Sequence, residues 1–100
     1  MSVEKQIVLA LKQVYDPEIP VNVYDLGLIY EVRVDILRKA FITMTLTSPN
    51  CPMVDDLLQD VHDAVSIVPG IEDVAIELTF EPPWDKSRMS EEAMFELGML

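Results

Sequence analysis

The spacing of the apolar residues switches along this chain between the period of a helix and the period of a strand. This order constrains the fold more than any other feature. Apolar side chains recur at helical spacing over residues 3–14, which predicts an amphipathic helix. Ser2 suits the N-cap position before this helix. Asp16 and Pro17 are expected to stop it, because a residue that precedes proline avoids the α region.

Two segments with strand periodicity come next. Residues 28–35 and 40–46 alternate between apolar and polar side chains, which predicts a β-hairpin with one wet face and a turn through residues 36–39. In the second of these strands, the inner face is expected to carry Ile42, Met44 and Leu46, and the outer, polar face Thr43 and Thr45.

The second half of the chain returns to the helical period and then to the strand period. Residues 53–68 are expected to form a second amphipathic helix that ends at Pro69 and Gly70. Residues 73–80 alternate as a third strand, whose inward side chains are expected to be Val74, Ile76, Leu78 and Phe80. Ser90 is expected to cap a short last helix.

The resulting order is α-β-β-α-β-α, which predicts the α+β class. We expect a two-layer sandwich in which helices cover one face of a small three-stranded sheet. The other face of the sheet is polar, so it is expected to be exposed or lightly covered. With 100 residues, the chain has the length of one compact domain, so residues 1–100 are expected to form a single domain.

The charge balance excludes some classes of partner. The chain carries 18 acidic and 7 basic residues, for a formal net charge of -11, and it has no basic stripe. Nucleic-acid binding is therefore not expected, because phosphate backbones attract basic surfaces. No secretory signal peptide is recognisable, and no apolar run approaches the ~20 residues of a membrane span. We therefore expect a cytoplasmic protein without a membrane partner.

Cys51 is the one cysteine of the chain and the residue with the most pointed chemistry. Pro52 suits the first position of a helix, which would place Cys51 at its N-cap. Unpaired backbone N–H groups and the helix dipole favour the thiolate there, which is the form that binds iron or attacks an electrophile. The alternative is a small apolar residue buried at a helix start. The acidity of the chain also opposes ionisation of the thiol.

Other polar residues could complete a site around this cysteine. The hydroxyls of Thr47 and Ser48 could donate hydrogen bonds to a sulfur, although such residues more often satisfy turn backbone. Carboxylates in the proline-stiffened loop could ligate iron or contact a partner, namely Asp16, Glu18 and Asp25. Asp16 and Asp25 have simpler roles open to them, as caps of turns.

Catalytic use of the cysteine is not favoured. His62 follows Cys51 by eleven positions on the expected helix, about 16 Å along its axis, so the two cannot form a dyad within that helix. One cysteine also cannot supply the several thiolates that an iron–sulfur cluster needs. A cluster would have to be shared between chains, use oxygen ligands, or be held briefly. Trp84 is expected to pack the last helix onto the sheet.

Three segments together resemble one known family: residues 16–30 (DPEIPVNVYDLGLIY), 45–53 (TLTSPNCPM) and 80–93 (FEPPWDKSRMSEEA). They are similar to SufT/PaaD-type proteins of the MIP-eighteen family of iron–sulfur cluster assembly proteins. The resemblance implies an iron–sulfur cluster assembly domain that matures iron–sulfur proteins and is not an enzyme. The residues carried over by the family motif are Asp16, Glu18 and Asp25, then Thr47 and Cys51, then Trp84, Arg88 and Ser90.

The resemblance also implies partners and cargo. Iron–sulfur assembly proteins and apo-protein clients are the expected partners, in a SUF-type system, and a homodimer is one arrangement open to the chain. Transient iron or an iron–sulfur cluster is the expected cargo, with Cys51 as the metal ligand. A non-catalytic module that recruits apo-proteins is the alternative. A PaaD-like role in a ring-hydroxylating system is a weaker alternative, because the chain ends in FELGML without the C-terminal cysteines common in those proteins.

Overall fold

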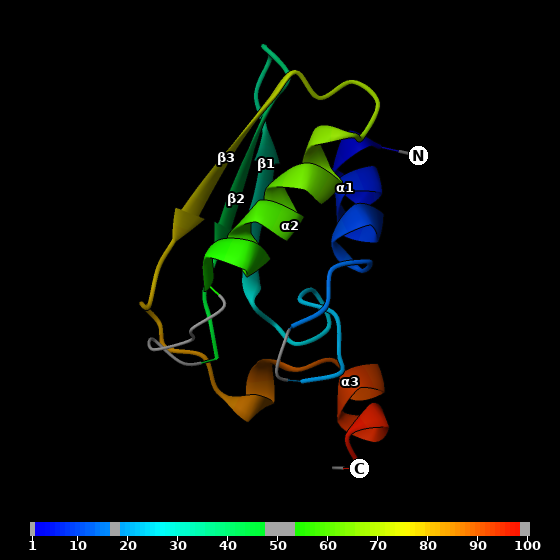
Figure 1. Cartoon of the computed structure of the whole chain (residues 1–100), viewed down its shortest axis with the longest axis vertical. Coiled ribbons are helices and arrows are strands. Elements are labelled where there is room, and N and C mark those ends of the chain that lie inside the picture. Colours follow the sequence, from blue (N-terminus) through cyan, green and yellow to red (C-terminus); the bar gives the residue numbers. More distant parts are fainter. Residues whose placement is uncertain (1, 17–18, 48–53, 99–100) are drawn as a thin grey trace.

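A computed structural model describes residues 2–16, 19–47 and 54–98 of the chain. Figure 1 shows helices packed on one side of a small sheet. The elements are α1 (Val3–Leu11), β1 (Ile29–Val34), β2 (Lys39–Met44), α2 (Val54–Ser66), β3 (Asp73–Leu78), a 3-10 helix η1 (Lys86–Arg88) and α3 (Glu91–Glu96). The predicted order α-β-β-α-β-α is confirmed, and the 3-10 turn is an addition to it.

The first helix is shorter than its apolar pattern predicts, because its last turn tightens. Ser2 caps the helix as expected, its side chain accepting a hydrogen bond from the Lys5 N–H. Beyond Leu11, the N–H of Gln13 donates to the carbonyl of Ala10, and the N–H of Val14 donates to the carbonyl of Leu11. Bonds that span three residues are of the 3-10 type, which commonly closes an α-helix.

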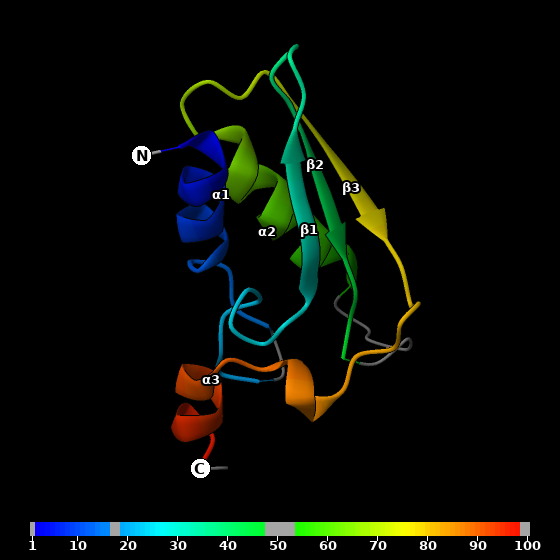
Figure 2. The ribbon, with the colours of Figure 1, turned by 180° about the vertical axis from the view of Figure 1, so that it is seen from behind.

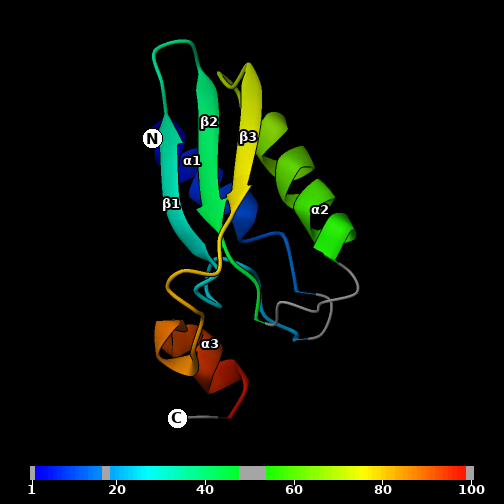
Figure 3. The same ribbon diagram turned by 90° about the vertical axis from the view of Figure 1, so that its left-hand side faces the viewer.

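The sheet has the strand order β1-β2-β3 and is mixed. β1 and β2 are antiparallel, with Val32 opposite Ile42, and β2 and β3 are parallel, with Ile42 opposite Ile76. The parallel pair is joined through α2, as a crossover connection requires. Figure 2 and Figure 3 show α1 and α2 on the same face of this sheet, which confirms the predicted two-layer arrangement.

The core lies between the helices and the inner face of the sheet. Each element contributes the side chains that its periodicity selects, and each such aliphatic side chain stabilises the fold by about 1.5–3 kcal/mol. The largest fully buried apolar residues include Ile7 and Leu11 of α1, Leu57, Val61 and Val65 of α2, and Ile42 and Met44 of β2. These are residues that the helical and strand periods predict to face inward.

The outer face of the sheet is polar, with the aromatic ring of Phe41 on the central strand. Arg33, Phe41 and Ala75 form one row across the three strands. The Arg33 guanidinium lies 4.5 Å from the centre of the Phe41 ring. No described element covers this face in Figure 3. The expectation of an exposed outer face therefore holds for the body of the sheet.

Two predicted side-chain positions are wrong, both just beyond the end of a strand. Phe80 was expected to point inward but is 41% exposed, because β3 ends at Leu78 and the chain then leaves the sheet. Thr45 was expected on the wet face but is fully buried, because it lies beyond the end of β2, where three segments of the chain meet.

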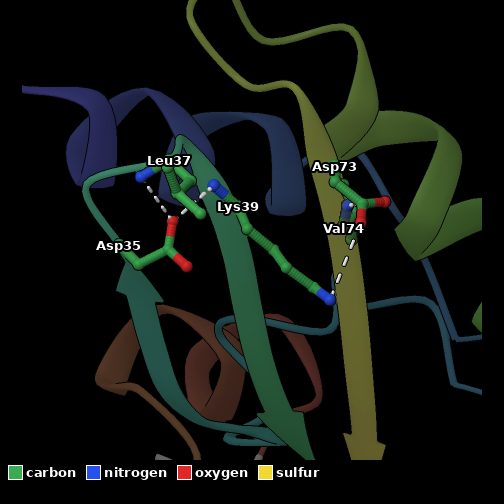
Figure 4. Close-up of polar contacts among 5 residues, drawn as sticks. All are labelled: Asp35, Leu37, Lys39, Asp73 and Val74. Atoms are coloured by element: carbon green, nitrogen blue, oxygen red, sulfur yellow. Dashed lines mark hydrogen bonds and ion pairs between the residues drawn. The ribbon is translucent and has the colours of Figure 1, made fainter.

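The hairpin turn at the opposite end of the sheet forms where the sequence predicts it. Figure 4 shows one carboxylate oxygen of Asp35 accepting hydrogen bonds from the backbone N–H groups of Leu37 and Lys39, both at 2.9 Å. The ammonium of Lys39 lies 3.6 Å from a carboxylate oxygen of Asp73 on β3. Side-chain capping of this kind lets a short polar segment close a turn.

None of the helices in residues 2–16, 19–47 and 54–98 is long and apolar enough to cross a bilayer.

Candidate functional site

The three segments that carry the family resemblance gather at the end of the sheet opposite the hairpin turn. Figure 1 places the described parts of the loop before β1, the chain after β2 and the chain after β3 at this end. We call it the loop end and define it by the described residues 19–28, 45–47 and 79–90. Backbone and side-chain hydrogen bonds join the three segments to one another.

The loop before β1 is held by an Asn–Asp pair. The Asn22 side chain accepts a hydrogen bond from the Asp25 N–H at 2.9 Å, and its amide donates to the Asp25 carboxylate at 2.8 Å. Asp25 was expected to cap a turn itself, but Asn22 supplies the turn-forming side chain. Asp25 lines a hollow of about 190 Å³ together with Glu92 and Glu96 of α3.

Gly27 lets the C-terminal segment approach the loop closely. Its φ is +84°, a conformation that favours glycine. A Cβ atom at this position would lie 2.2 Å from the carbonyl oxygen of Arg88. Any other residue would push the two segments apart. The sequence gives no sign of this contact.

Trp84 ties the C-terminal segment to the same loop. Its indole N–H donates to the carbonyl of Leu26 at 2.7 Å, and its ring packs against the core. Nearby, the N–H of Ser90 donates to the carbonyl of Asp25 at 2.8 Å. Trp84 therefore packs against the core, but the prediction that it packs the last helix onto the sheet is wrong, because α3 lies beyond the end of the sheet.

The chain after β2 runs between the other two segments. The Thr45 N–H donates to the carbonyl of Leu28 at 2.8 Å, and the carbonyl of Met44 accepts a hydrogen bond from the Thr79 N–H at 2.9 Å. The Thr45 hydroxyl is buried and has no hydrogen-bond partner within the described residues. Thr47, the last residue described before the cysteine segment, is half-buried.

The predicted site residues are only partly described. Asp16 is 7% exposed, and its carboxylate accepts a hydrogen bond from the Ile19 N–H at 3.1 Å, which fits the turn-capping alternative. Glu18, Ser48 and Cys51 lie outside the described residues, so the N-cap position of Cys51 stays a prediction. Within residues 2–16, 19–47 and 54–98, no three His, Cys, Asp or Glu side chains are grouped as a metal site would need.

His62 lies on the exposed side of α2. Its side chain is 46% exposed, and its Nδ1 lies 3.6 Å from the Asp63 carboxylate. A histidine in this position is set among the solvated acidic residues of the helix.

Sequence reasoning missed one pair at the loop end. The Arg88 guanidinium lies 4.8 Å from the centre of the Tyr30 ring, and the Tyr30 hydroxyl donates to the carbonyl of Pro82 at 2.7 Å. These residues line a hollow of about 420 Å³ with Gly27 and Ile29. A separation of 58 positions between Tyr30 and Arg88 leaves no local signal that could have found the pair.

The short helix that carries Arg88 is capped by Asp85. The Asp85 carboxylate accepts hydrogen bonds from the hydroxyl and the backbone N–H of Ser87. The bond from the Ser87 hydroxyl has the largest effect in holding the pKa of Asp85 below its usual value, and the bond from the Ser87 N–H acts in the same direction. The nearby charge of Arg88 lowers this pKa further.

Comparison with known proteins agrees with this arrangement. The profile of a family described as iron-sulfur cluster assembly protein matches residues 4–78. A protein of Porphyromonas gingivalis named Fe-S protein maturation auxiliary factor is 57% identical over 100% of this chain and 95% of its own length. The Fe-S protein maturation auxiliary factor SufT of Staphylococcus aureus is 37% identical over 86% of this chain and 98% of its own length.

Solved structures share the fold. A crystal structure of a domain of unknown function, DUF59, from Bacillus anthracis has a TM-score of 0.92 and 38% identity, covering 98% of this chain and 93% of that one. The Thermotoga maritima protein TM0487 has a TM-score of 0.83 and 37% identity, covering 98% of this chain and 99% of that one. The chain therefore belongs to the iron–sulfur cluster assembly protein family, among the Fe–S protein maturation auxiliary factors that include SufT.

Proposed function

We propose that this chain helps apo-proteins acquire iron–sulfur clusters by holding iron or a cluster briefly through Cys51. The observation that carries this proposal is the 57% identity to a maturation auxiliary factor over the whole chain. The gathering of the three family segments at one end of the sheet supports it, because residues from distant parts of the sequence would then act at one place. The role is accessory and non-catalytic.

The chemistry of the predicted residues suits such a role. A thiolate is the side-chain form that binds iron, and the start of a helix favours it. Hydroxyls such as those of Thr47 and Ser48 can donate hydrogen bonds to a bound sulfur. The carboxylates of Asp16, Glu18 and Asp25 would orient the loop or contact a cationic surface of an assembly partner.

One thiolate for each chain makes the cargo labile. Iron–sulfur clusters are usually held by several cysteines, so the remaining ligands would come from a second chain or from the recipient protein. A weakly held cluster is also one that a recipient with a full ligand set can take up. The shortage of ligands thus favours a transfer role over permanent storage.

Anaerobic reconstitution with ferrous iron and sulfide tests the ligand role. The wild-type chain should take up iron and give a sulfur-to-iron absorption band, whereas Cys51→Ser should lose both. Thr43→Ala, on the exposed face of the sheet, is the matched control and should behave as wild type. Equal iron uptake by wild type and Cys51→Ser would show that the cysteine is not the ligand.

Transfer to an apo-protein tests the function itself. Loaded wild-type chain should restore activity to an apo iron–sulfur enzyme faster than free iron and sulfide do. A Cys51→Ser chain that binds no iron yet still accelerates maturation would favour the recruiting-module alternative. No acceleration by the loaded wild type would contradict a direct transfer role.

A further inference from the structure

An apolar groove lies exposed on the outer side of α1. We call it the α1 groove; it has a volume of about 310 Å³ and is lined by Lys5, Val8, Leu9 and Tyr24. Leu9 is 49% exposed and Tyr24 is 38% exposed. The ammonium of Lys12 lies 5.6 Å from the centre of the Tyr24 ring. The groove therefore offers an apolar floor bordered by two cations.

An acidic surface with an exposed aromatic side chain lies on α3. Phe95 is 74% exposed, and a hollow beside it is lined by Glu91, Glu92 and Glu96. The other side of α3 is anchored, because Ala93 is buried and Met94 packs against the core. We call this the α3 knob, defined as Phe95 with its three glutamates. Within the part of the chain that the structure describes, most of the Phe95 side chain is left uncovered.

The two surfaces are complementary in charge. All three charged residues of α3 are carboxylates, and the α1 groove holds two of the 7 basic residues of the chain. On a molecule with a net charge of -11, few places attract an acidic segment. Complementary charges steer and select the partner of an apolar contact.

The two helices that carry these surfaces follow one another along the long axis of the molecule. Figure 1 and Figure 2 agree that α3 lies beyond the end of α1 along the long axis, on the helical side of the sheet. A two-fold axis between the two helices would bring each α3 knob to the other copy's α1 groove. Such an interface is isologous and closes on itself.

We propose that two copies of this chain form a symmetric dimer in which Phe95 of each copy enters the α1 groove of the other. The glutamates around Phe95 then face Lys5 and Lys12 of the second copy. Two identical contacts form at once, which offsets the mutual repulsion of two acidic chains. The occupant of the groove is a second copy because this chain itself carries both complementary halves.

Sedimentation velocity of the full chain over a concentration series tests the proposal. The wild type should convert from monomer to dimer, and Phe95→Ala should raise the dissociation constant at least tenfold. Ile36→Ala is the matched control, because Ile36 is 97% exposed at the far end of the molecule. A wild type that stays monomeric up to about 1 mM would overturn the proposal. An equal effect of Ile36→Ala would overturn it too.

A charge exchange gives a sharper test. One variant combines Lys5→Glu and Lys12→Glu, and the other combines Glu92→Lys and Glu96→Lys. Each alone should be monomeric, because like charges then face each other at both contacts. Their equimolar mixture should form a heterodimer, since both contacts regain opposite charges. A mixture that stays monomeric, or a variant that dimerises alone as the wild type does, would contradict the arrangement.

Folding must be separated from association in both tests. Far-ultraviolet circular dichroism and thermal unfolding should match the wild type for every variant, because the substituted side chains are exposed or, for Lys12, half-buried. If Phe95→Ala alone fails to fold, Leu9→Asn in the α1 groove replaces it, with the same expected rise in the dissociation constant. A folded Leu9→Asn chain that dimerises as the wild type does would overturn the proposal.

Discussion

The two ends of the sheet are closed by different kinds of contact. At the hairpin turn, the bonds made by the Asp35 side chain span two and four residues. At the loop end, Trp84 bonds to Leu26 across 58 residues, and Tyr30 bonds to Pro82 across 52. The side-chain bonds that close the turn therefore come from neighbours in sequence, although the Glu72 N–H also donates to the Arg38 carbonyl there at 2.9 Å, whereas the loop end also depends on bonds between segments more than 50 residues apart.

Burial follows the same division. Ile36 and Leu37 at the turn are 97% and 77% exposed, although both are large and apolar. At the loop end, Thr45 is fully buried although it is polar. The turn should thus tolerate substitution, while the loop end should respond strongly to changes that alter the approach of its segments.

The largest expected effect is at Gly27. Gly27→Ala should lower the free energy of unfolding by about 3 kcal/mol, because the new methyl group meets the Arg88 carbonyl at 2.2 Å in a strained backbone conformation. Urea unfolding measures this. Gly98→Ala is the control, since Gly98 has φ +72° but a Cβ atom built there would meet no atom of the described residues within 4 Å beyond its chain neighbours, so only about 1 kcal/mol is expected. Equal losses would show that the close contact with Arg88 is unimportant.

The next effect is at Trp84. Trp84→Phe keeps an aromatic ring but removes the donor to the Leu26 carbonyl, which should lower the free energy of unfolding by about 1.5 kcal/mol. Tyr30→Phe removes a hydrogen bond in an exposed setting and should cost less than about 1 kcal/mol. A larger loss of stability in Tyr30→Phe than in Trp84→Phe would show that the Tyr30 hydrogen bond is the more important of the two.

A smaller effect is expected at the turn. Asp35→Ala removes the acceptor of two backbone N–H groups that water can reach, so the loss should be about 1 kcal/mol, or about 4–8 °C in Tm for a chain of this size. Asp35→Asn retains an acceptor oxygen in the same place, so it should keep most of the stability that Asp35→Ala loses. A loss as large as that of Gly27→Ala would contradict the contrast between the two ends.

The smallest effect is expected from the ion pair beside the turn. Lys39 and Asp73 are 3.6 Å apart with side chains 39% and 65% exposed. Lys39→Met should lower the free energy of unfolding by about 0.5 kcal/mol or less, because exposed pairs are screened by water and ions. Thermal unfolding at low salt and at about 1 M salt should show the difference shrinking as the Debye length shortens. A difference that grows with salt would exclude a Coulombic origin.

The parts of the fold that the sequence predicted correctly are those built from short-range patterns. The caps by Ser2 and Ser90, the turn at residues 36–39 and the inward faces of α1, α2 and β2 are all confirmed. The errors at Phe80 and Thr45 occur within two residues of a strand end. Periodicity predicts which way a side chain points only while the strand continues, so it fails where the chain departs from the sheet.

The candidate site likewise contains residues that the sequence singled out and contacts that only the structure shows. The sequence singled out Asp16, Asp25 and Thr47, and the structure accounts for the two carboxylates by hydrogen bonds within their own loop. The Arg88–Tyr30 pair and the contact of Gly27 with Arg88 had no local signature. They depend on backbone segments about 60 positions apart, and no spacing rule relates such residues.

The sequence by itself determined the order of the elements, the faces that they bury and the family to which the chain belongs. These follow from interactions within about four residues and from motifs whose order is visible in the chain. Only the tertiary structure decided which loops meet beyond the sheet, which glycine must admit another backbone, and which apolar groove and knob remain uncovered. Such contacts form between residues that become neighbours through folding, so their chemistry is set by geometry that no local pattern contains.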